Sequence, residues 1–119
     1  MLNSLHSGKV YLAFGETDMR KSIDGLALLV QESFRLDPFS KCMFVFCNRR
    51  KDKIKILYWE DNGFWLYYKR LEKGNFRWPA ISSQNKAVGV TERELRWLLD
   101  GLSLEQTSAH KPVTQRAII

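Results

Sequence analysis

The sequence predicts an α+β domain, with an antiparallel β-meander of about four to five strands beside one long and one short helix. Three patterns predict this fold class. Short β-branched and aromatic runs with an Asn-Gly hairpin signal fill residues 41–78. Apolar residues recur every three or four positions over 19–34, and a capping box near residue 91 precedes a leucine stripe. With 119 residues, 45% of them hydrophobic, the chain is long enough for one domain with a substantial core.

The domain should span residues 9–102. A flexible arm is expected at 1–8 and a flexible tail at 103–119, because neither end shows apolar periodicity. No apolar run approaches the roughly 18 residues needed to cross a bilayer. The N-terminal segment lacks the basic and apolar regions of a signal peptide. The chain is therefore expected in the cytoplasm, with no membrane partner.

A strand is expected first, at residues 10–14, which Gly15 ends. A helix should follow, because Thr17 or Asp18 can accept hydrogen bonds from the free amides of a first helical turn. Gly25 would let a neighbouring element approach this helix closely, and the turn at 37–40 requires the helix to end before it. The apolar face of the helix would carry Met19, Ile23, Leu26, Val30 and Phe34.

The polar residues at the start of this helix have two interpretations. Asp18, Arg20, Lys21 and Asp24 form either a cap with a solvated face or a patch that contacts a partner. Arg20 and Lys21 are therefore candidate partner-binding residues.

The meander should begin with residues 43–47, which are apolar on both faces, as in a central strand covered from both sides. A polar connection at 48–52 leads to a strand at 53–58 that alternates cationic and apolar residues. Cys42 and Cys47 should point to opposite faces of the sheet as free thiols, since they are five residues apart.

A hairpin should continue the meander at residues 61–63, because Asn62-Gly63 accepts the positive φ values of a type I′ turn. The partner strand, 64–69, is aromatic on both faces, and its Trp65 and Tyr67 share one of them. A turn at 72–75 should lead to a short fourth strand at 76–78.

The last part of the fold should be a loop at 81–87 and a short helix. Thr91 and Glu94 have the spacing of a capping box, and Gly101 is a suitable C-terminal stop. The apolar stripe of this helix would consist of Leu95, Leu98, Leu99 and Leu102, with Trp97 beside it.

Positive charge is concentrated in residues 41–78. This segment holds ten of the nineteen Lys and Arg residues, four of the thirteen Asp and Glu residues, and ten of the fifteen aromatic residues. Its net charge of +6 equals the formal charge of the whole chain. Such a combination favours a polyanionic partner: nucleic acid first, and an anionic membrane surface second.

Motifs of catalysis are absent from the sequence. It has no P-loop, no dinucleotide fingerprint and no zinc-binding spacing. His6 and His110 lie near opposite ends of the chain, so neither a metal site nor an activated serine is expected. The carboxylates of Asp18, Asp24, Glu60 and Asp61 follow no pattern of a two-metal nuclease. We therefore expect a protein that is not an enzyme and needs no cofactor.

Several motifs together resemble a known family. They are TDMRKSIDGL at 17–26, DPFS at 37–40, NRRKDKIK at 48–55, YWEDNG at 58–63, KRLEKG at 69–74 and FRWP at 76–79. In this order they resemble TnpB, the second-open-reading-frame accessory proteins of the insertion-sequence sixty-six family of transposable elements. The resemblance covers roughly residues 10–102. Ser22 stands where glycine is usual, and residues 101–104 depart from the common ending.

The resemblance implies an accessory protein of transposition and DNA recombination, acting with a separate transposase on the DNA of the element ends. On this hypothesis DNA-binding residues from the first hairpin meet phosphates, and a second set extends their surface. If the DNA is single-stranded or distorted, an exposed Trp65 or Tyr67 could stack on its bases; the alternative is that these residues pack in the core. The first set is Arg49, Arg50, Lys51, Lys53 and Lys55, and the second is Lys69, Arg70, Lys73 and Arg77.

An alternative is a protein-interaction module. It would bridge or stabilise the transposase, or other element-encoded proteins, without binding DNA directly. Trp65 and Tyr67 would then form the contact, and the basic residues would serve solubility. A sheet edge at 76–78 could also pair with another copy, which would make the protein a homo-oligomer.

Overall fold

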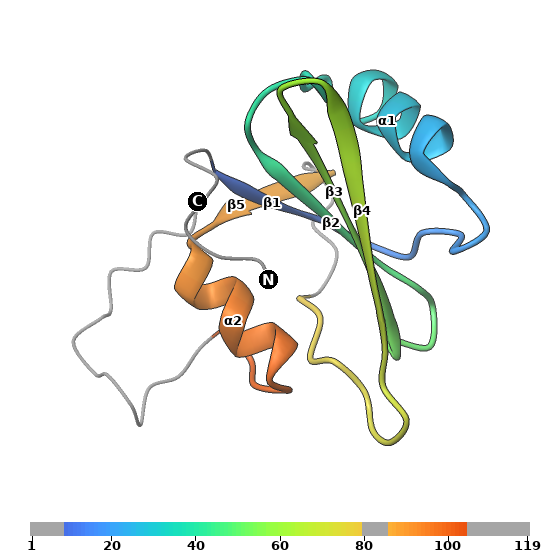
Figure 1. The fold of residues 1–119 in the computed structure, drawn as a ribbon. Coiled ribbons are helices and arrows are strands. Elements are labelled where there is room, and N and C mark those ends of the chain that lie inside the picture. Colours follow the sequence, from blue (N-terminus) through green and yellow to red (C-terminus); the bar gives the residue numbers. More distant parts are fainter. Residues whose placement is uncertain (1–8, 80–85, 105–119) are drawn as a thin grey trace.

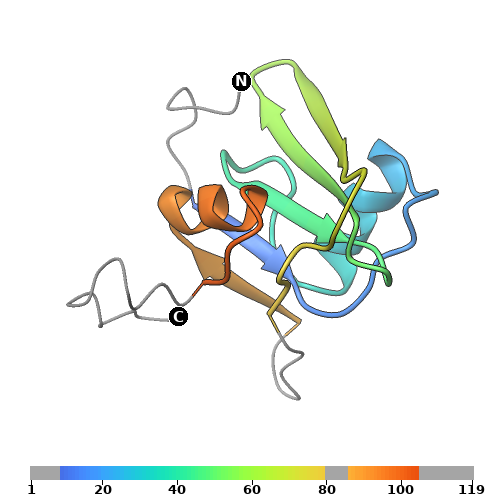
Figure 2. The same cartoon turned by 90° about the horizontal axis from the view of Figure 1, so that it is seen from below.

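The computed structural model describes residues 9–79 and 86–104 and has the predicted α+β fold. One five-stranded sheet, in the order β4-β3-β2-β1-β5, lies between two helices (Figures 1 and 2). None of the described helices is long and apolar enough to span a membrane. The elements are β1 (Val10–Ala13), α1 (Ile23–Glu32), β2 (Met43–Cys47), β3 (Lys53–Glu60), β4 (Gly63–Arg70), β5 (Ala87–Val90) and α2 (Glu92–Leu99).

Each face of the sheet is covered by one helix. On one face, Leu26 and Val30 of α1 pack against Phe44, Phe46 and Leu57. On the other face, α2 contributes Leu95 and Leu98 to a second cluster. The strand β2 supplies side chains to both clusters and is buried along its whole length. This burial was predicted from the apolar residues on both of its faces. Cys42 and Cys47 lie on opposite faces as free thiols, as predicted.

The sheet is not a simple meander, because β1 pairs in parallel with β2, in the register Val10↔Met43. Between them the chain crosses over through α1, so both strands run in the same direction. The other pairings, β2–β3, β3–β4 and β1–β5, are antiparallel.

The predicted fourth strand at residues 76–78 does not form. This segment has no regular secondary structure and alternates in burial, with Phe76 and Trp78 buried and Arg77 exposed. Its pairing is replaced by isolated bonds: the Phe76 amide donates to Lys51 O, and Trp78 Nε1 donates to Ala13 O at 2.9 Å. The segment therefore closes the core on the α2 side instead of extending the sheet.

The fifth strand was not predicted, and it overlaps the predicted loop only at Ala87. Within the predicted loop at 81–87, residues 81–85 lie outside the described residues, and Ala87 begins β5. Gly89 interrupts the β-branched run of this segment, so the sequence did not predict a strand here. Its position lies beside the Tyr11 ring of β1, where an added Cβ would be 3.6 Å from Cε1.

The long helix begins later than predicted. It starts at Ile23 with Ser22 as N-cap, because Asp18 is engaged in a local turn with Arg20 instead of capping. Met19, Ile23 and Phe34 still pack on the α1 side of the core as partly buried residues. The atoms nearest to the space above Gly25 belong to the stem of Lys21, 3.3 Å from where a Cβ would lie.

The β3–β4 hairpin is confirmed, with its turn one residue earlier than predicted. Glu60 pairs with Gly63, so the two turn residues are Asp61 and Asn62, and Asp61 has the positive φ of 48°. This placement pairs Trp59 with Phe64 across the two strands. The predicted arm at 1–8 lies outside the described residues, and so do residues 105–119 of the predicted tail at 103–119.

The short helix confirms both of its predicted ends. Thr91 accepts a hydrogen bond from the Glu94 amide, and the Glu94 carboxylate accepts one from the Thr91 amide. At the other end, Gly101 has a φ of 86°. The Gly101 amide donates to Leu98 O and the Leu102 amide to Trp97 O, which is the Schellman arrangement.

Candidate nucleic-acid interface

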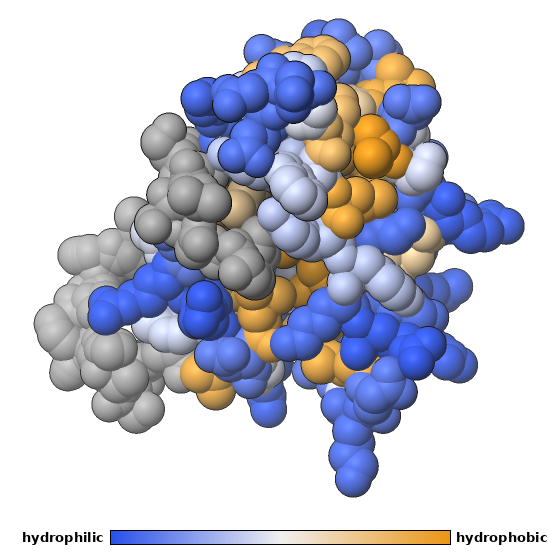
Figure 3. All heavy atoms as spheres, viewed as in Figure 1, coloured by the Kyte–Doolittle hydropathy of each residue, from blue (hydrophilic) through white to orange (hydrophobic). Residues whose placement is uncertain are grey.

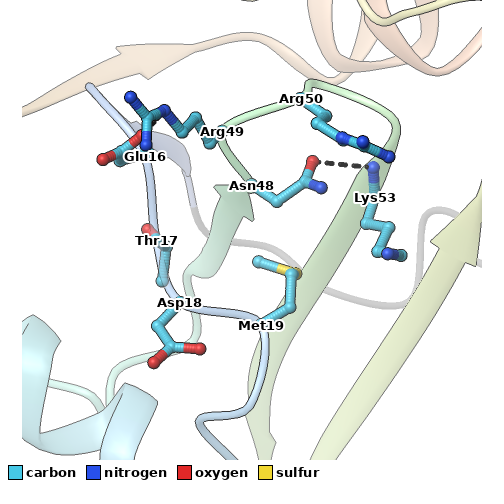
Figure 4. A pocket seen from close by; sticks show the side chains of 8 residues that line it. All are labelled: Glu16, Thr17, Asp18, Met19, Asn48, Arg49, Arg50 and Lys53. Atoms are coloured by element: carbon cyan, nitrogen blue, oxygen red, sulfur yellow. Dashed lines mark hydrogen bonds and ion pairs between the residues drawn. The ribbon is translucent and has the colours of Figure 1, made fainter.

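The β2–β3 turn holds the predicted basic loop in a defined shape. Asn48 organises the turn, because its Oδ1 accepts from the amides of Asp52 and Lys53 at 3.0 and 2.9 Å. Its Nδ2 donates to the Asp52 carboxylate at 2.7 Å, and this bond lowers the pKa of Asp52. Figure 4 shows Asn48 below the turn, with Arg49 and Arg50 on the chain above it. Both arginines are exposed.

The segment that follows β4 is fastened to this turn. The Leu71 amide donates to Asp52 O at 2.8 Å, and Asn75 Nδ2 donates to Arg50 O at 2.7 Å. Together with the bond from Phe76 to Lys51 O, these contacts hold two sequence-distant segments side by side. The two predicted sets of basic residues therefore meet at one end of the sheet.

We call this region the cationic end: Arg49, Arg50, Lys51, Lys53, Arg70, Lys73 and Arg77. The strands bring Lys53 and Arg70 into register. In Figure 3, hydrophilic side chains gather at the lower right, over the β2–β3 turn and the segment after β4. Within residues 49–53 and 70–77, seven cations face two carboxylates, Asp52 and Glu72, so the two segments carry a net charge of +5.

The acidic partners at this end are exposed. Arg49 lies 3.6 Å from Glu16, with side chains 87% and 59% accessible, and Arg70 lies 2.9 Å from Glu72. Ion pairs of such exposure contribute about 0–1 kcal/mol and exchange readily. The arginines therefore remain able to meet another anion.

A hollow of about 490 Å³ lies between the β2–β3 turn and the loop after β1. The loop is anchored by the Thr17 amide, which donates to Cys47 O at 2.8 Å. Figure 4 shows that cations line the hollow from the turn and that carboxylates line it from the loop. Its lining consists of Glu16, Thr17, Asp18, Met19, Asn48, Arg49, Arg50 and Lys53.

Asp18 and Arg20 form a local pair beside this hollow. Asp18 accepts the Arg20 amide at 2.9 Å and its guanidinium Nη2 at 2.9 Å. The side-chain bond from Arg20, followed by the amide bond, lowers the pKa of Asp18 to about 2. Arg20 and Lys21, the two predicted partner-binding residues next to it, are both exposed. The guanidinium of Arg20 is already bonded to Asp18.

Two of the predicted DNA-binding residues have structural contacts. Lys55 Nζ donates to Met19 O at 2.7 Å and to Lys21 O at 2.9 Å, and it lies over the Tyr68 ring. Lys69 Nζ donates to Leu99 O at 3.2 Å, at the C-terminus of α2, where the helix dipole favours a cation. These side chains point back onto the fold, so we leave both out of the cationic end.

The predicted aromatic residues lie on β4, toward the hairpin. Trp65 is 51% exposed and stacks on Tyr67, with ring centroids 5.9 Å apart and an interplanar angle of 10°. Its Nε1 donates to the Glu60 carboxylate. Tyr67 also packs against the core on the α2 side. The pair is thus partly packed in the core and partly exposed, so it combines the two arrangements that the sequence left open: core packing and an exposed aromatic surface.

An aromatic cluster that the sequence did not predict lies near the hairpin, away from the cationic end. Trp59 and Phe64 have ring centroids 5.0 Å apart, and Phe39 lies 5.0 Å from Trp59. Phe39 is 55% exposed. The sequence of the turn at 37–40, which carries Phe39, did not predict this contact, because the cluster depends on the pairing of β3 with β4.

The nominated carboxylates do not converge. Asp18 and Asp24 lie before and within α1, whereas Glu60 and Asp61 lie at the hairpin. In residues 9–79 and 86–104, no group of three or more His, Cys, Asp or Glu side chains could hold a metal ion.

Comparisons with known proteins give one family. The family model described as IS66 Orf2 like protein matches residues 8–109. The chain is 37% identical over 102 residues to the uncharacterized protein y4hO of Sinorhizobium fredii (strain NBRC 101917 / NGR234), covering 86% of this chain and 87% of that one. It is 30% identical over 105 residues to the uncharacterized protein y4jC of the same strain, covering 88% and 87%. No solved structure matches.

Proposed function

The chain belongs to the family of IS66 Orf2 like proteins, and we propose that it serves transposition by binding DNA through its cationic end. Membership makes it an accessory protein of an insertion sequence, as the motifs of the sequence predicted. The proposed role is non-catalytic: the protein contacts element DNA while a separate transposase carries out the chemistry.

A single observation supports this proposal. Two segments that are distant in the sequence bring seven cationic side chains to one end of the sheet, with a net charge of +5. Hydrogen bonds to backbone carbonyls of the turn and the buried Phe76 hold the two segments together, so the fold sets the backbone positions of these charges. A cationic surface of this kind suits phosphate contacts, which supply affinity without sequence choice.

The test is a titration of duplex DNA carrying the element ends. Reversing three charges, Arg49→Glu, Arg50→Glu and Lys51→Glu, should weaken binding by about a hundredfold or more at low salt, because phosphate contacts dominate affinity. The matched control reverses Lys86, Arg93 and Arg96, which are exposed residues outside the cationic end. Both triple variants have a net charge of 0, starting from +6, so only the position of the charges differs.

The control triple should keep its affinity within about threefold. Equal losses in both triples would reduce the effect to net charge and contradict the proposal. Circular dichroism would verify that both variants fold.

A second candidate function is contact with the transposase, independent of DNA. The exposed Trp65, with Arg20 and Lys21 on the other side of the molecule, favours it. Co-purification of transposase from nuclease-treated extract at high salt would support this role. The complex should then survive the triple reversal at 49–51, whereas DNA binding should not.

A further inference from the structure

The outer edge of β4 has no pairing partner among the described residues. The strand is the last in the sheet order, and all eight of its residues pair with β3 on the inner side without a bulge. Trp65 and Tyr68 are 51% and 53% exposed. The opposite edge, β5, has only four residues.

The pairing pattern shows which backbone groups face outward. In an antiparallel ladder, residues alternate between those bonded to the partner strand and those directed away from it. The Leu71 amide donates to Asp52 O, which puts the odd-numbered residues of β4 in bonded pairs with β3. The amides and carbonyls of Phe64, Leu66, Tyr68 and Arg70 therefore point outward.

Natural sheets protect such an edge. Proline, bulges, inward-pointing charges or very short strands prevent unwanted pairing. From residue 64 to residue 68 β4 has none of these, and its sequence there is FWLYY. An edge of this length and apolar character is suited to pairing with another strand.

We propose that β4 pairs with β4 of a second copy of this chain, antiparallel, with the two-fold axis at Leu66. The outward groups of the two strands then bond to each other, which joins the sheets into one of ten strands. In this register Trp65 lies opposite Tyr67 of the second copy, and Phe64 lies opposite Tyr68. Cross-strand aromatic pairs of this kind stabilise sheets.

Charge complementarity favours a second copy as the occupant. One end of β4 is cationic, with Lys69 and Arg70, and the other is the hairpin with Glu60 and Asp61. Antiparallel pairing places Lys69 of one copy opposite Gly63 of the other, and Arg70 opposite Asn62. Gly63 has no side chain, and an added Cβ there would meet nothing within 4 Å, so nothing at this position obstructs the cationic strand end of the second copy. To reach Glu60 across it, Lys69 would exchange its bond to Leu99 O, which is 3.2 Å long in the single chain.

The surface of the hairpin has space for these cations. A hollow of about 340 Å³ is lined by Glu60, Asp61, Asn62, Gly63, Phe64 and Trp65. Asp61 is 79% accessible and has a distant partner, Lys41 at 4.0 Å. The pairing thus brings a cationic strand end to an acidic hollow twice, once in each copy.

This inference replaces the predicted edge at 76–78, which forms no strand, and it does not depend on DNA binding. It is tested first by sedimentation of the full chain without DNA. A species of twice the 14.0 kDa chain mass is expected, with a monomer–dimer equilibrium that shifts with concentration. A monomer over the whole accessible concentration range would overturn the proposal.

The backbone contact is tested at Tyr68. Tyr68→Pro removes an outward amide but leaves the bonds to β3, and it should raise the dimer dissociation constant by about tenfold or more, since two symmetric bonds are lost. Tyr68→Val removes the ring and keeps the amide, so its effect should be smaller. Equal effects of the two variants, with both folded by circular dichroism, would overturn strand pairing.

The register is tested by crosslinking with a short bismaleimide. At the axis, two Leu66 Cα atoms lie about 5.5 Å apart, whereas two Tyr68 Cα atoms are offset by about 14 Å. In a Cys42→Ser background, Leu66→Cys should crosslink and the more exposed Tyr68→Cys should not. Burial raises the pKa of the Cys47 thiol to about 12, so this native cysteine stays unreactive. Preferential crosslinking through position 68, or through neither position, would overturn the register.

Discussion

Lys55 illustrates how its contacts in the fold add to what the residue type alone predicts. Its position in a basic run predicted a phosphate contact, but its ammonium group binds the carbonyls of Met19 and Lys21. Those carbonyls belong to the loop before α1, which is also anchored to β2 by the bond from the Thr17 amide to Cys47 O. Lys55 therefore connects β3 to that loop, and its neighbour Lys53 remains at the cationic end.

Replacement of Lys55 should affect stability more than DNA binding. Lys55→Met keeps the aliphatic stem and removes both bonds, so the free energy of unfolding should fall by about 1–2 kcal/mol. Arg50→Met, at the exposed turn, should change it by less than about 0.5 kcal/mol. Urea denaturation of the two variants measures the difference. An equal stability for both would contradict the anchoring role of Lys55.

The Asp18–Arg20 pair should make stability depend on acid pH. The hydrogen bonds from Arg20 lower the pKa of Asp18 from 3.8 to about 2 in the folded chain. Between these values the unfolded chain binds more protons, so the contribution is complete above about pH 4 and is lost as pH falls through 2. An NMR titration should place the Asp18 midpoint near 2. In Arg20→Gln the midpoint should return toward the ordinary value, and an unchanged midpoint would contradict this cause.

At the level of elements, several local signals were confirmed, whereas the strand predicted at 76–78 and the helix N-cap predicted at Thr17 or Asp18 were wrong. The central strand β2, the β3–β4 hairpin and the capping box of α2 were predicted because each depends on residues close in sequence. The parallel β1–β2 pairing was not, because it depends on where α1 leads the chain. β5 was missed because Ala87–Val90 is short and contains a glycine.

The candidate site shows the same division. Its residues were predicted from charge, whereas the bonds that join residues 50–52 to 71–76 depend on tertiary structure. The sequence could not separate Lys55 and Lys69, whose ammonium groups reach backbone carbonyls, from the outward-facing cations.

The cap of α2 gives a prediction at the scale of an element. Thr91→Ala leaves the Glu94 amide without its acceptor and should lower the free energy of unfolding by about 1 kcal/mol, whereas Thr91→Asp should retain most of it. Chemical denaturation measures both. The two variants should not differ in DNA affinity, because Thr91 lies outside the cationic end.

The whole molecule separates its charges from its aromatic surface along β3 and β4. Lys53 and Arg70 lie at one end, and the cluster of Trp59, Phe64 and Phe39 lies near the other, about 20 Å away along the strands. The proposed pairing through β4 would put the two cationic ends at opposite ends of a joined sheet. The two Arg70 Cα atoms would be about 27 Å apart along the strands. The β2–β3 turns extend beyond Arg70 at both ends, so the separation of the two cationic ends approaches the roughly 34 Å of one DNA helical turn.

The salt dependence of DNA binding tests the central claim most directly. For duplex element-end DNA, the logarithm of the association constant should fall with the logarithm of salt concentration with a slope of about −4 to −6, since up to seven cations meet phosphates. Arg50→Met should reduce the magnitude of this slope by about 0.9, and Lys55→Met should leave it unchanged. No binding at low salt, or a slope that Arg50→Met does not alter, would contradict the assignment of the cationic end as the DNA-binding surface.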